Sequence, residues 1–522
     1  MTQSQFRDPR ALLTSLHQAA VQGADPFVRT RDAVTEWIAE SNVARSSRVH
    51  VVALGKAAAA MAAGAVHALN AAHLQLVGGI VVVAAKIGAD AKAEQGGSLP
   101  SSIIVRVGDH PVPDIGSLAA SDAIARIVNA VQDDDVALVL ISGGATSLCA
   151  APCAELVQEF GRAFDLQVLL RNLATTLHES GLTIHEMNTV RRRLLRWTAG
   201  RLAVALFERG AAVIPTFAIS DVIGDDPSVI GSGPCSPDPN DLAGALALMG
   251  AMALHNKVPR ELSVLLGLGG DKAAAITTPR ATHPAFELVR YRIIARNRDS
   301  CRAMADEARR LGINNIVVAD VPISGEAETL GHTIAATALR AAQSKDEQLI
   351  IWGGEPIVRM DMWHRVQANV DSTGPLPDTL NVAAPGACPS LKMHSLDMHH
   401  AQGPLGGRMQ ALALAGCLAL EQAQLQSRMY AASRITLLAA GTDGRDGPTD
   451  ACGAIVDAST PNASRTAGRD PVRDLHRLRS YYALDAAHAL LKTGPTGTNV
   501  MDVVAAYIAP DDNLPYVVFA SS

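Results

Sequence analysis

Short runs of apolar, β-branched residues alternate with helical patterns in the first half of the chain. We expect strands at 49–54, 80–84, 103–107, 136–141 and 213–220, and a helix over the Ala-rich segment 56–70. Nearly continuous apolar strands are typical of a parallel sheet covered on both faces. The alternation of these strands with helices therefore predicts an α/β fold.

A second series of apolar runs follows a polar, proline-containing stretch at 277–284, which is typical of a connection between domains. The expected strands of this second α/β unit are 291–295, 316–319, 349–352 and 435–440. We accordingly predict one domain at 1–275 and another at 288–522. Residues 356–402 are too long for an ordinary loop, and we expect a surface insertion there.

Composition narrows the functional classes. Of the 522 residues, 48% are hydrophobic and only 3% aromatic, which favours helix contacts made by small side chains. The net charge of −6 gives no general attraction to nucleic acid or anionic lipid. No apolar stretch is long enough to span a membrane, and the N-terminal residues do not form a signal sequence. With seven scattered cysteines expected as reduced thiols, we predict a cytoplasmic protein, either a monomer or a homodimer.

Glycine and a lysine meet directly after the first predicted strand. Gly55 permits a sharp turn, and Lys56 opens the helix that follows. A lysine at the positive end of a helix is favourable only beside an anion, so Lys56 is a candidate catalytic cation and Gly55 a candidate cofactor-binding residue. The alternative is an exposed lysine, since the chain has no P-loop motif.

The strongest predicted strand, 136–141, runs into a turn that combines two glycines with hydroxyl side chains. Ser142, Gly143, Gly144 and Ser147 form a backbone nest suited to phosphate oxygens, and we treat them as candidate cofactor-binding residues. A tight turn with a Ser or Thr helix cap would account for the same residues.

Aspartates follow the strand at 213–220. Asp221, Asp225 and Asp226 place three carboxylates within six residues, which repel one another unless a cation neutralises them. Mg²⁺ prefers one or two carboxylates together with substrate phosphates. Asp221 and Asp225 are therefore candidate metal ligands, and Asp226 is expected in a solvated turn.

The second domain repeats this logic after its last predicted strand. Thr442, Asp443 and Asp446 lie in a glycine-rich loop and are candidate cofactor-binding residues; the spacing of a calcium loop is absent. Arg408 follows two glycines and opens an Ala/Leu-rich helix, where it could bind a carboxylate or a transferring phosphate. An ordinary surface arginine is the alternative.

Read together, seven ordered blocks resemble the glycerate 2-kinases that carry a C-terminal MOFRL domain. The blocks are ALGKAAAAMAAGA from Ala53, GDHPVPDIGS from Gly108, ISGGATSL from Ile141, NTVRRRLL from Asn188, AISDVIGDDPSVIGSGP from Ala218, AGTDGRDGPTDACGAIVD from Ala440 and TGPTGTNVMD from Thr493. The resemblance implies a Rossmann-like N-terminal domain with a parallel sheet, a mixed-sheet C-terminal MOFRL domain and an active site in the cleft between them. It also implies ATP, Mg²⁺, D-glycerate as acceptor and 2-phosphoglycerate as product.

The resemblance assigns Lys56 and Arg408 as the expected active-site cations. In the mechanism that we expect, these two cations neutralise the moving phosphoryl group or the glycerate carboxylate, and Asp221 holds Mg²⁺ or orients the acceptor hydroxyl. The chain departs from the family pattern at three places: Met409 and Ala411 follow Arg408 where the family has Asn and Glu, Thr198 replaces a lysine, and Pro356 and Ile357 replace a Thr pair.

Two other functions are compatible with the same blocks. One is an oxidoreductase that acts on hydroxypyruvate or tartronate semialdehyde, but the G-x-G-x-x-G turn that it would need after the first strand is missing. The other is a non-catalytic ligand-binding relative. The two Asp-rich loops argue against it, because clustered carboxylates are costly to keep without a cation.

Overall fold

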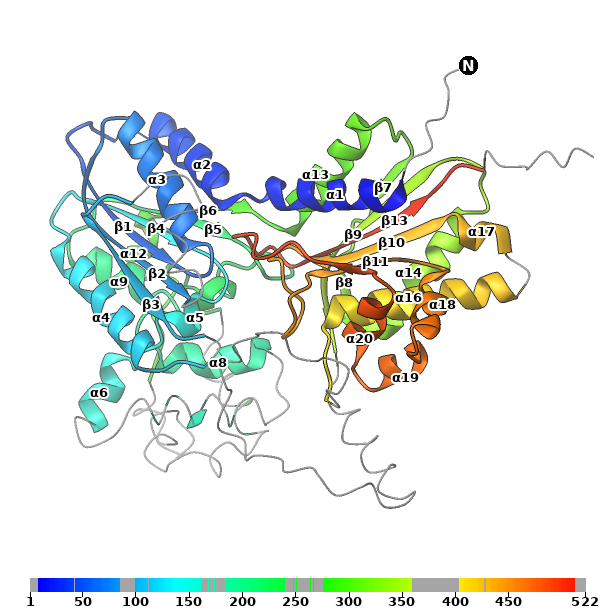
Figure 1. Cartoon of the computed structure of the whole chain (residues 1–522). Helices are drawn as coiled ribbons and strands as arrows, with labels where there is room; N and C mark the ends of the chain where they lie inside the picture. The colour runs from blue at the N-terminus through cyan, green and yellow to red at the C-terminus, as the bar shows by residue number, and fades with distance from the viewer. Residues whose placement is uncertain are drawn as a thin grey trace, which may run out of the picture. The chain divides into compact units, whose positions relative to one another are not determined.

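The computed structural model describes residues 8–41, 43–84, 99–110, 112–160, 184–239, 276–358, 403–426 and 429–511, with isolated positions between 161 and 183 and between 240 and 275. The chain forms two compact units, each with its own sheet (Figure 1). The N-terminal unit comprises Ala20–Ser300 and Gly497–Met501. The C-terminal unit comprises Met1–Ala19, Cys301–Thr496 and Asp502–Ser522.

The N-terminal unit is built on a six-stranded sheet in the order β3-β2-β1-β4-β5-β6. Every neighbouring pair is parallel, so the expected Rossmann-like parallel sheet is confirmed. The strands are β1 (Arg48–Leu54), β2 (Gln75–Ala84), β3 (Ile103–Gly108), β4 (Val136–Ile141), β5 (Ile214–Ile219) and β6 (Val289–Ala295). The helices are α2 (Pro26–Glu40), α3 (Ala58–Ala71), α4 (Ile115–Ala130), α5 (Ala145–Leu148), α6 (Ala154–Phe160), α8 (Ile184–Leu194), α9 (Arg201–Glu208) and α12 (Ala285–Leu288), with a 3₁₀ turn, η2, at Ile230–Ser232.

Both faces of this sheet are buried, because alternate residues of each strand enter different cores. In β1, Val51 and Ala53 pack into the core under α2 and α3, whereas Val52 and Leu54 pack into the core under α4 and α9 (Figure 1). Burial on both sides explains why these strands are continuous apolar runs rather than alternating ones.

One strand assignment from the sequence is wrong. The strand at 291–295 was expected in the second unit, but β6 pairs in parallel with β5 and completes the first sheet. An apolar run of this length specifies a strand and not its partner, because partner choice depends on the connections around it. The predicted domain boundaries at 275 and 288 divide the chain differently from the compact units, and they stay predictions. The insertion expected at 356–402 lies almost entirely outside the described residues.

The C-terminal unit contains a seven-stranded mixed sheet in the order β12-β11-β10-β13-β9-β7, with β8 also paired to β9. Its strands are β7 (Ile316–Val318), β8 (Ile323–Glu326), β9 (Gln348–Ile357), β10 (Ile435–Gly441), β11 (Gly453–Asp457), β12 (Leu490–Leu491) and β13 (Asp502–Ile508). Its helices are α14 (Ala327–Ala341), α16 (Arg408–Leu425), α17 (Met429–Ser433), α18 (Thr460–Thr466), α19 (Pro471–His476) and α20 (Ser480–Ala486), together with the first part of α1 (Pro9–Gly23) and most of α13 (Asn297–Arg310). The mixed sheet expected from the family resemblance is confirmed.

Small residues mediate the main helix contacts in both units, as the composition predicts. In the N-terminal unit Gly64 of α3 lies against the backbone of Phe27 in α2, and in the C-terminal unit Gly331 of α14 lies against the backbone of Leu412 in α16. A Cβ at either glycine would collide with a carbonyl oxygen, so the short distance between helices requires these glycines. None of the helices in the described part of the chain is long and apolar enough to span a bilayer.

Candidate active site

The carboxyl ends of β1, β4 and β5 bring three separate segments together in the N-terminal unit. β1 and β4 are adjacent central strands, and the chain leaves them toward opposite sides of the sheet. Ligands of open α/β sheets bind at such a switch point. The segments that meet there contain Lys56, the turn Ser142–Gly144 and Asp221.

Hydrogen bonds lock the first two of these turns to each other. The Lys56 N–H donates to the carbonyl oxygen of Gly143 at 2.9 Å, and the Ala57 N–H donates to the Ser142 hydroxyl at 3.1 Å. Gly55 has φ +120°, and a Cβ there would collide with Ser142. The two turns therefore form one rigid base that fixes where the Lys56 side chain begins.

Asp221 lies against the backbone of Gly143. A Cβ on Gly143 would overlap the Asp221 carboxylate, so glycine is required for this approach. The amide of Asn499 donates to the same carboxylate at 3.5 Å. Asn499 comes from the short segment Gly497–Met501, which is held in the N-terminal unit by the bond from Asn297 Nδ2 to the Val500 carbonyl oxygen at 2.8 Å. Sequence reasoning missed Asn499, although the block TGPTGTNVMD contains it.

Two basic side chains lie beside Gly144, which opens α5 with φ +85°, and a third reaches Ser147. A Cβ on Gly144 would lie 3.3 Å from Lys56 Cγ and 3.4 Å from His110 Cδ2. Arg191, from α8, donates from Nη2 to the Ser147 hydroxyl at 3.3 Å. Sequence reasoning did not single out His110 or Arg191; the signal that could have found His110 is its position just after β3.

The charges of Lys56 and Arg191 both act on His110. His110 is exposed along one edge, yet desolvation of its ring, followed by the charges of Lys56 and Arg191, lowers its pKa to about 4. Burial lowers the pKa of the Arg191 guanidinium. His110 is therefore neutral at physiological pH, and the positive charge of the cluster comes from Lys56 and Arg191.

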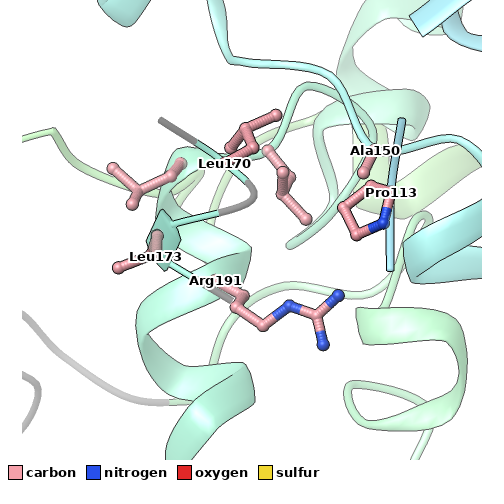
Figure 2. Close-up of a pocket in the computed structure, with 7 residues that line it drawn as sticks. Pro113, Ala150, Leu170, Leu173 and Arg191 are labelled. Atoms are coloured by element: carbon pink, nitrogen blue, oxygen red, sulfur yellow. The ribbon is translucent and has the colours of Figure 1, made fainter. Parts of the chain in front are cut away.

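Figure 2 shows a small pocket beside this cluster, of about 10 Å³, close to the volume that one water needs. The Arg191 guanidinium points away from Leu170 and Leu173, so its aliphatic stem lines the pocket while its charged end does not. The pocket is lined by Pro113, Ala150, Leu170, Leu173, Arg191, Leu194 and Leu195. It is too small and too apolar to hold a substrate, and it anchors the arginine stem instead.

The remaining acidic residues after β5 have other partners. Asp225 pairs with Arg296, with 3.4 Å between Oδ2 and Nη1. Asp226 accepts from the Ser228 N–H at 2.8 Å, as expected for a polar turn. The described residues contain no group of three or more His, Cys, Asp or Glu side chains placed to hold a metal ion. The metal-ligand role of Asp225 stays a prediction.

In the C-terminal unit, Arg408 lies at the start of α16 and joins an ion network. Its Nε and Nη2 donate to Asp502 at 2.6 and 3.2 Å, and its Nη1 donates to Glu355 at 2.9 Å. Burial opposes the guanidinium charge, but Asp502 and Glu355 outweigh burial and hold the pKa of Arg408 above its usual range. Burial raises the pKa of Asp502 to about 7, against the two hydrogen bonds from Arg408. Neither carboxylate was singled out from the sequence.

Asp446 caps α16. Its carboxylate accepts from the backbone N–H groups of Met409 at 3.2 Å and Gln410 at 2.8 Å, and burial raises its pKa to about 6. Asp443 accepts from the Arg445 N–H at 3.0 Å within the same loop. These contacts give both aspartates structural roles, and their predicted cofactor-binding roles, like that of Thr442, stay predictions.

Among the departures from the family pattern, Met409, Ala411 and Thr198 are buried and Ile357 is exposed. Met409 is fully buried, and the hydroxyl of Thr198 donates to the carbonyl oxygens of Arg192 and Leu195 at 2.7 and 3.0 Å. Lys56 and Arg408 belong to different compact units. The expected cleft that both would line therefore stays a prediction.

Comparisons with known proteins agree with this architecture. Residues 12–267 match a family described as a domain of unknown function (DUF4147), and residues 396–502 match the MOFRL family. The chain is 30% identical over 481 residues to a protein of Thermotoga maritima named D-glycerate 2-kinase, which covers 91% of this chain and 94% of the relative. It is 32% identical over 501 residues to a protein of Agrobacterium vitis that is provisionally named a hydroxypyruvate reductase, which covers 96% of this chain and 94% of the relative.

The structure is also similar to a solved one. The crystal structure of glycerate kinase from Thermotoga maritima matches with a TM-score of 0.69 and 26% identity, covering 96% of this chain and 99% of that one. The likeness extends over both compact units, and the family models match segments of each. The chain belongs to the glycerate 2-kinase family with a C-terminal MOFRL domain.

Proposed function

We propose that this chain is an ATP-dependent glycerate kinase that converts D-glycerate to 2-phosphoglycerate. Membership of the family supports the reaction class, and the Thermotoga maritima relative carries the name of this activity. The observation that carries the proposal is the interlocked pair of turns after β1 and β4. They place Lys56, two backbone glycines and Asp221 at one switch point of the sheet.

Phosphoryl transfer depends on positioning and charge neutralisation more than on covalent chemistry, and this cluster can supply both. Gly144 presents backbone without a side chain between Lys56 and His110, and Lys56 brings a positive charge to the same edge. The Ser142 hydroxyl contacts the Ala57 N–H and the Leu54 carbonyl oxygen, so we assign it to holding the turn. Asp221 would orient the acceptor hydroxyl or accept a metal ion.

Asp221 fits a magnesium ion as a single protein carboxylate. Mg²⁺ needs hard oxygen ligands in octahedral geometry and commonly combines one or two carboxylates with phosphate oxygens and water. Asp221 lies beside the glycine turn, where phosphates would be, whereas Asp225 faces a guanidinium. When bound, Mg²⁺ neutralises charge on the phosphate oxygens. The residues of the chain hold the carboxylate in place through Asn499 and Gly143.

Arg408 would contribute a second cation. An arginine has five N–H donors, and the contacts to Asp502 and Glu355 engage three of them in a fixed orientation. We propose that this preorganised guanidinium neutralises substrate charge during the same reaction as Lys56.

The direct test is an assay of the purified chain with ATP, Mg²⁺ and D-glycerate. We expect ADP release that depends on D-glycerate, and a product whose ³¹P and ¹H NMR spectra match 2-phosphoglycerate. A spectrum of 3-phosphoglycerate would support the proposed kinase activity and refute the assigned position of phosphorylation. Absence of glycerate-dependent ADP release, from a chain that unfolds cooperatively on heating, would refute the proposed activity.

A reductase is the second candidate, because the Agrobacterium vitis relative has that provisional name and the strand order is that of dinucleotide-binding folds. The turn after β1 opposes it, because Gly55-Lys56 replaces the glycine fingerprint that lets a pyrophosphate approach. We expect no oxidation of NADH or NADPH with hydroxypyruvate. The cytoplasmic location and the monomer or homodimer remain expectations from the sequence.

A further inference from the structure

Lys56, His110 and Arg191 come from three different elements and lie near the start of α5. Lys56 follows β1, His110 follows β3 and Arg191 projects from α8. The Lys56 and His110 side chains approach the same side of Gly144, and Arg191 reaches Ser147, three residues further along. We refer to these three side chains as the basic cluster.

The basic cluster differs in its partners from the sites of Arg192 and Arg408. Arg192, the next residue along α8, pairs with the buried carboxylate of Asp238 at 3.0 Å, and Arg408 pairs with Asp502. Within the part of the chain that the structure describes, no carboxylate pairs with Lys56 or Arg191. Burial disfavours the Arg191 charge, so the site holds positive charge that an anion would stabilise.

We propose that the basic cluster is an oxyanion-binding site that holds a carboxylate or phosphate group of a substrate, with Arg191 as the residue that determines specificity. This inference rests on the proposed kinase function, because both substrates of that reaction are anions.

The chemistry of the three groups suits one oxyanion. A guanidinium is a planar fork that can donate two parallel hydrogen bonds to a carboxylate or phosphate. The apolar pocket around the Arg191 stem and the Ser147 hydroxyl fix the orientation of that fork (Figure 2). Lys56 adds a point charge, and neutral His110 can donate one N–H. Because Gly144 has no side chain, the space between Lys56 and His110 stays open.

The test compares Arg191→Met and Arg191→Lys with the wild type. Methionine keeps a stem that packs in the apolar pocket and removes the charge, whereas lysine keeps the charge and removes the fork. Arg106→Met is the matched control, since Arg106 is an exposed arginine of the same unit that bonds only the neighbouring Val105 carbonyl oxygen among the described residues. The measurements are KM for D-glycerate, KM for ATP, and calorimetric binding of D-glycerate, ADP and inorganic phosphate, one at a time.

We expect Arg191→Met to weaken the binding of one of the two substrates by about 10- to 100-fold. We expect an intermediate loss in Arg191→Lys and no change in Arg106→Met. If D-glycerate binds more weakly while the binding of ATP and ADP is unchanged, the bound group is the carboxylate. If ATP, ADP and phosphate bind more weakly while the binding of D-glycerate is unchanged, the bound group is a phosphate. Unchanged binding of all the probes, or equal weakening of both substrates, would overturn the proposal.

Two further arms keep the result decisive. If Arg191→Met does not fold, His110→Asn takes its place in the test, since His110 is exposed. We expect His110→Asn to weaken the binding of one of the two substrates about 5-fold. Unchanged binding of both substrates would overturn the proposal. If the wild type shows no glycerate-dependent turnover, the proposed function is refuted, and the calorimetry still tests whether the basic cluster binds an anion. Loss of anion binding in Arg191→Met then supports the site, and a wild type that binds none of the three probes overturns it.

Discussion

Lys56 is the residue on which the proposed chemistry depends most. Its backbone is hydrogen-bonded to the turn after β4, and its side chain lies beside Gly144. A positive charge at the start of a helix is unfavourable unless it meets an anion. This arrangement favours the active-site role of Lys56 over an ordinary exposed lysine, and that role stays a prediction.

We predict that Lys56→Ala lowers kcat at least about 100-fold, since loss of one charged contact to a transferring phosphoryl group costs roughly 3 kcal/mol of barrier. The unfolding temperature should stay close to that of the wild type. The measurement is the coupled ADP-release assay together with a thermal melt. Lys345→Ala, at an exposed lysine of the C-terminal unit, is the control. Turnover within a few-fold of wild type in Lys56→Ala would remove Lys56 from the mechanism.

At the scale of single residues, the sequence identified the groups that stand beside glycines and missed their partners. Lys56 and Asp221 were found because they follow apolar strands directly. His110, Arg191, Asn499 and Asp502 lie in the quoted blocks of sequence, and Glu355 lies outside them. They were not assigned, because no local sequence pattern predicts which side chains from distant segments will contact one another. Such contacts are decided by the tertiary structure.

At the scale of elements, the turn between β4 and α5 controls the site. Glycine at 143 lets the Asp221 carboxylate approach the backbone, and glycine at 144, with a positive φ, leaves space between Lys56 and His110. The sequence predicted a phosphate nest here from the glycines and hydroxyls. The structure adds that Ser142 and Ser147 already have partners within the protein, so the backbone is the part available for phosphate.

We predict that Gly143→Ala lowers kcat at least about 10-fold without unfolding the protein, because the added methyl group overlaps the Asp221 carboxylate and must displace it. The same enzyme assay and a far-UV circular dichroism spectrum check it. Gly250→Ala is the matched control, since a Cβ there meets no atom of the described residues within 4 Å. Equal turnover in Gly143→Ala and the control would show that the position of Asp221 does not matter.

The cap of α16 predicts an unusual pH dependence. Burial raises the pKa of Asp446 to about 6 from an ordinary 3.8, so the folded state holds its proton more tightly than the unfolded state does. The stability that Asp446 contributes is then fully present below pH 4 and is lost as the pH rises through 6. We predict that the free energy of unfolding of the wild type, minus that of Asp446→Asn, falls by up to about 3 kcal/mol from pH 4 to pH 7. Urea denaturation across this range measures both free energies, and a rise of the wild type relative to the variant would contradict the prediction.

At the scale of the whole molecule, the short segment 497–502 contributes a residue to the surroundings of Asp221 and another to those of Arg408. Asn499 lies in the N-terminal unit and bonds Asp221, whereas Asp502, three residues later, lies in the C-terminal unit and binds Arg408. Val500, between them, is fully buried in the core of the N-terminal unit. The hydrogen-bond partners of Asp221 and of Arg408 thus both include a residue from this one short segment.

We predict that Lys56 and Arg408 act in one step. If they do, the loss of kcat in the double variant Lys56→Ala, Arg408→Lys will be smaller than the product of the losses in the two single variants, because either change already disables the transition state. Lysine at 408 keeps the charge beside Asp502 and limits the effect on folding. Losses that multiply fully in a folded double variant would mean that the two cations serve separate steps.

The sequence alone determined the fold class, most strands of the parallel sheet, the family, and the candidate residues that follow strand ends. These features follow from hydrophobic periodicity and from glycine, which act through neighbours along the chain. The tertiary structure decided what depends on distant neighbours. It gave β6 to the first sheet, placed the unassigned strand β13 between β9 and β10, and made Asp446 a helix cap. It also brought Arg191 and His110 to Lys56. Pairing and side-chain contact arise from long-range packing, which no short window of sequence contains.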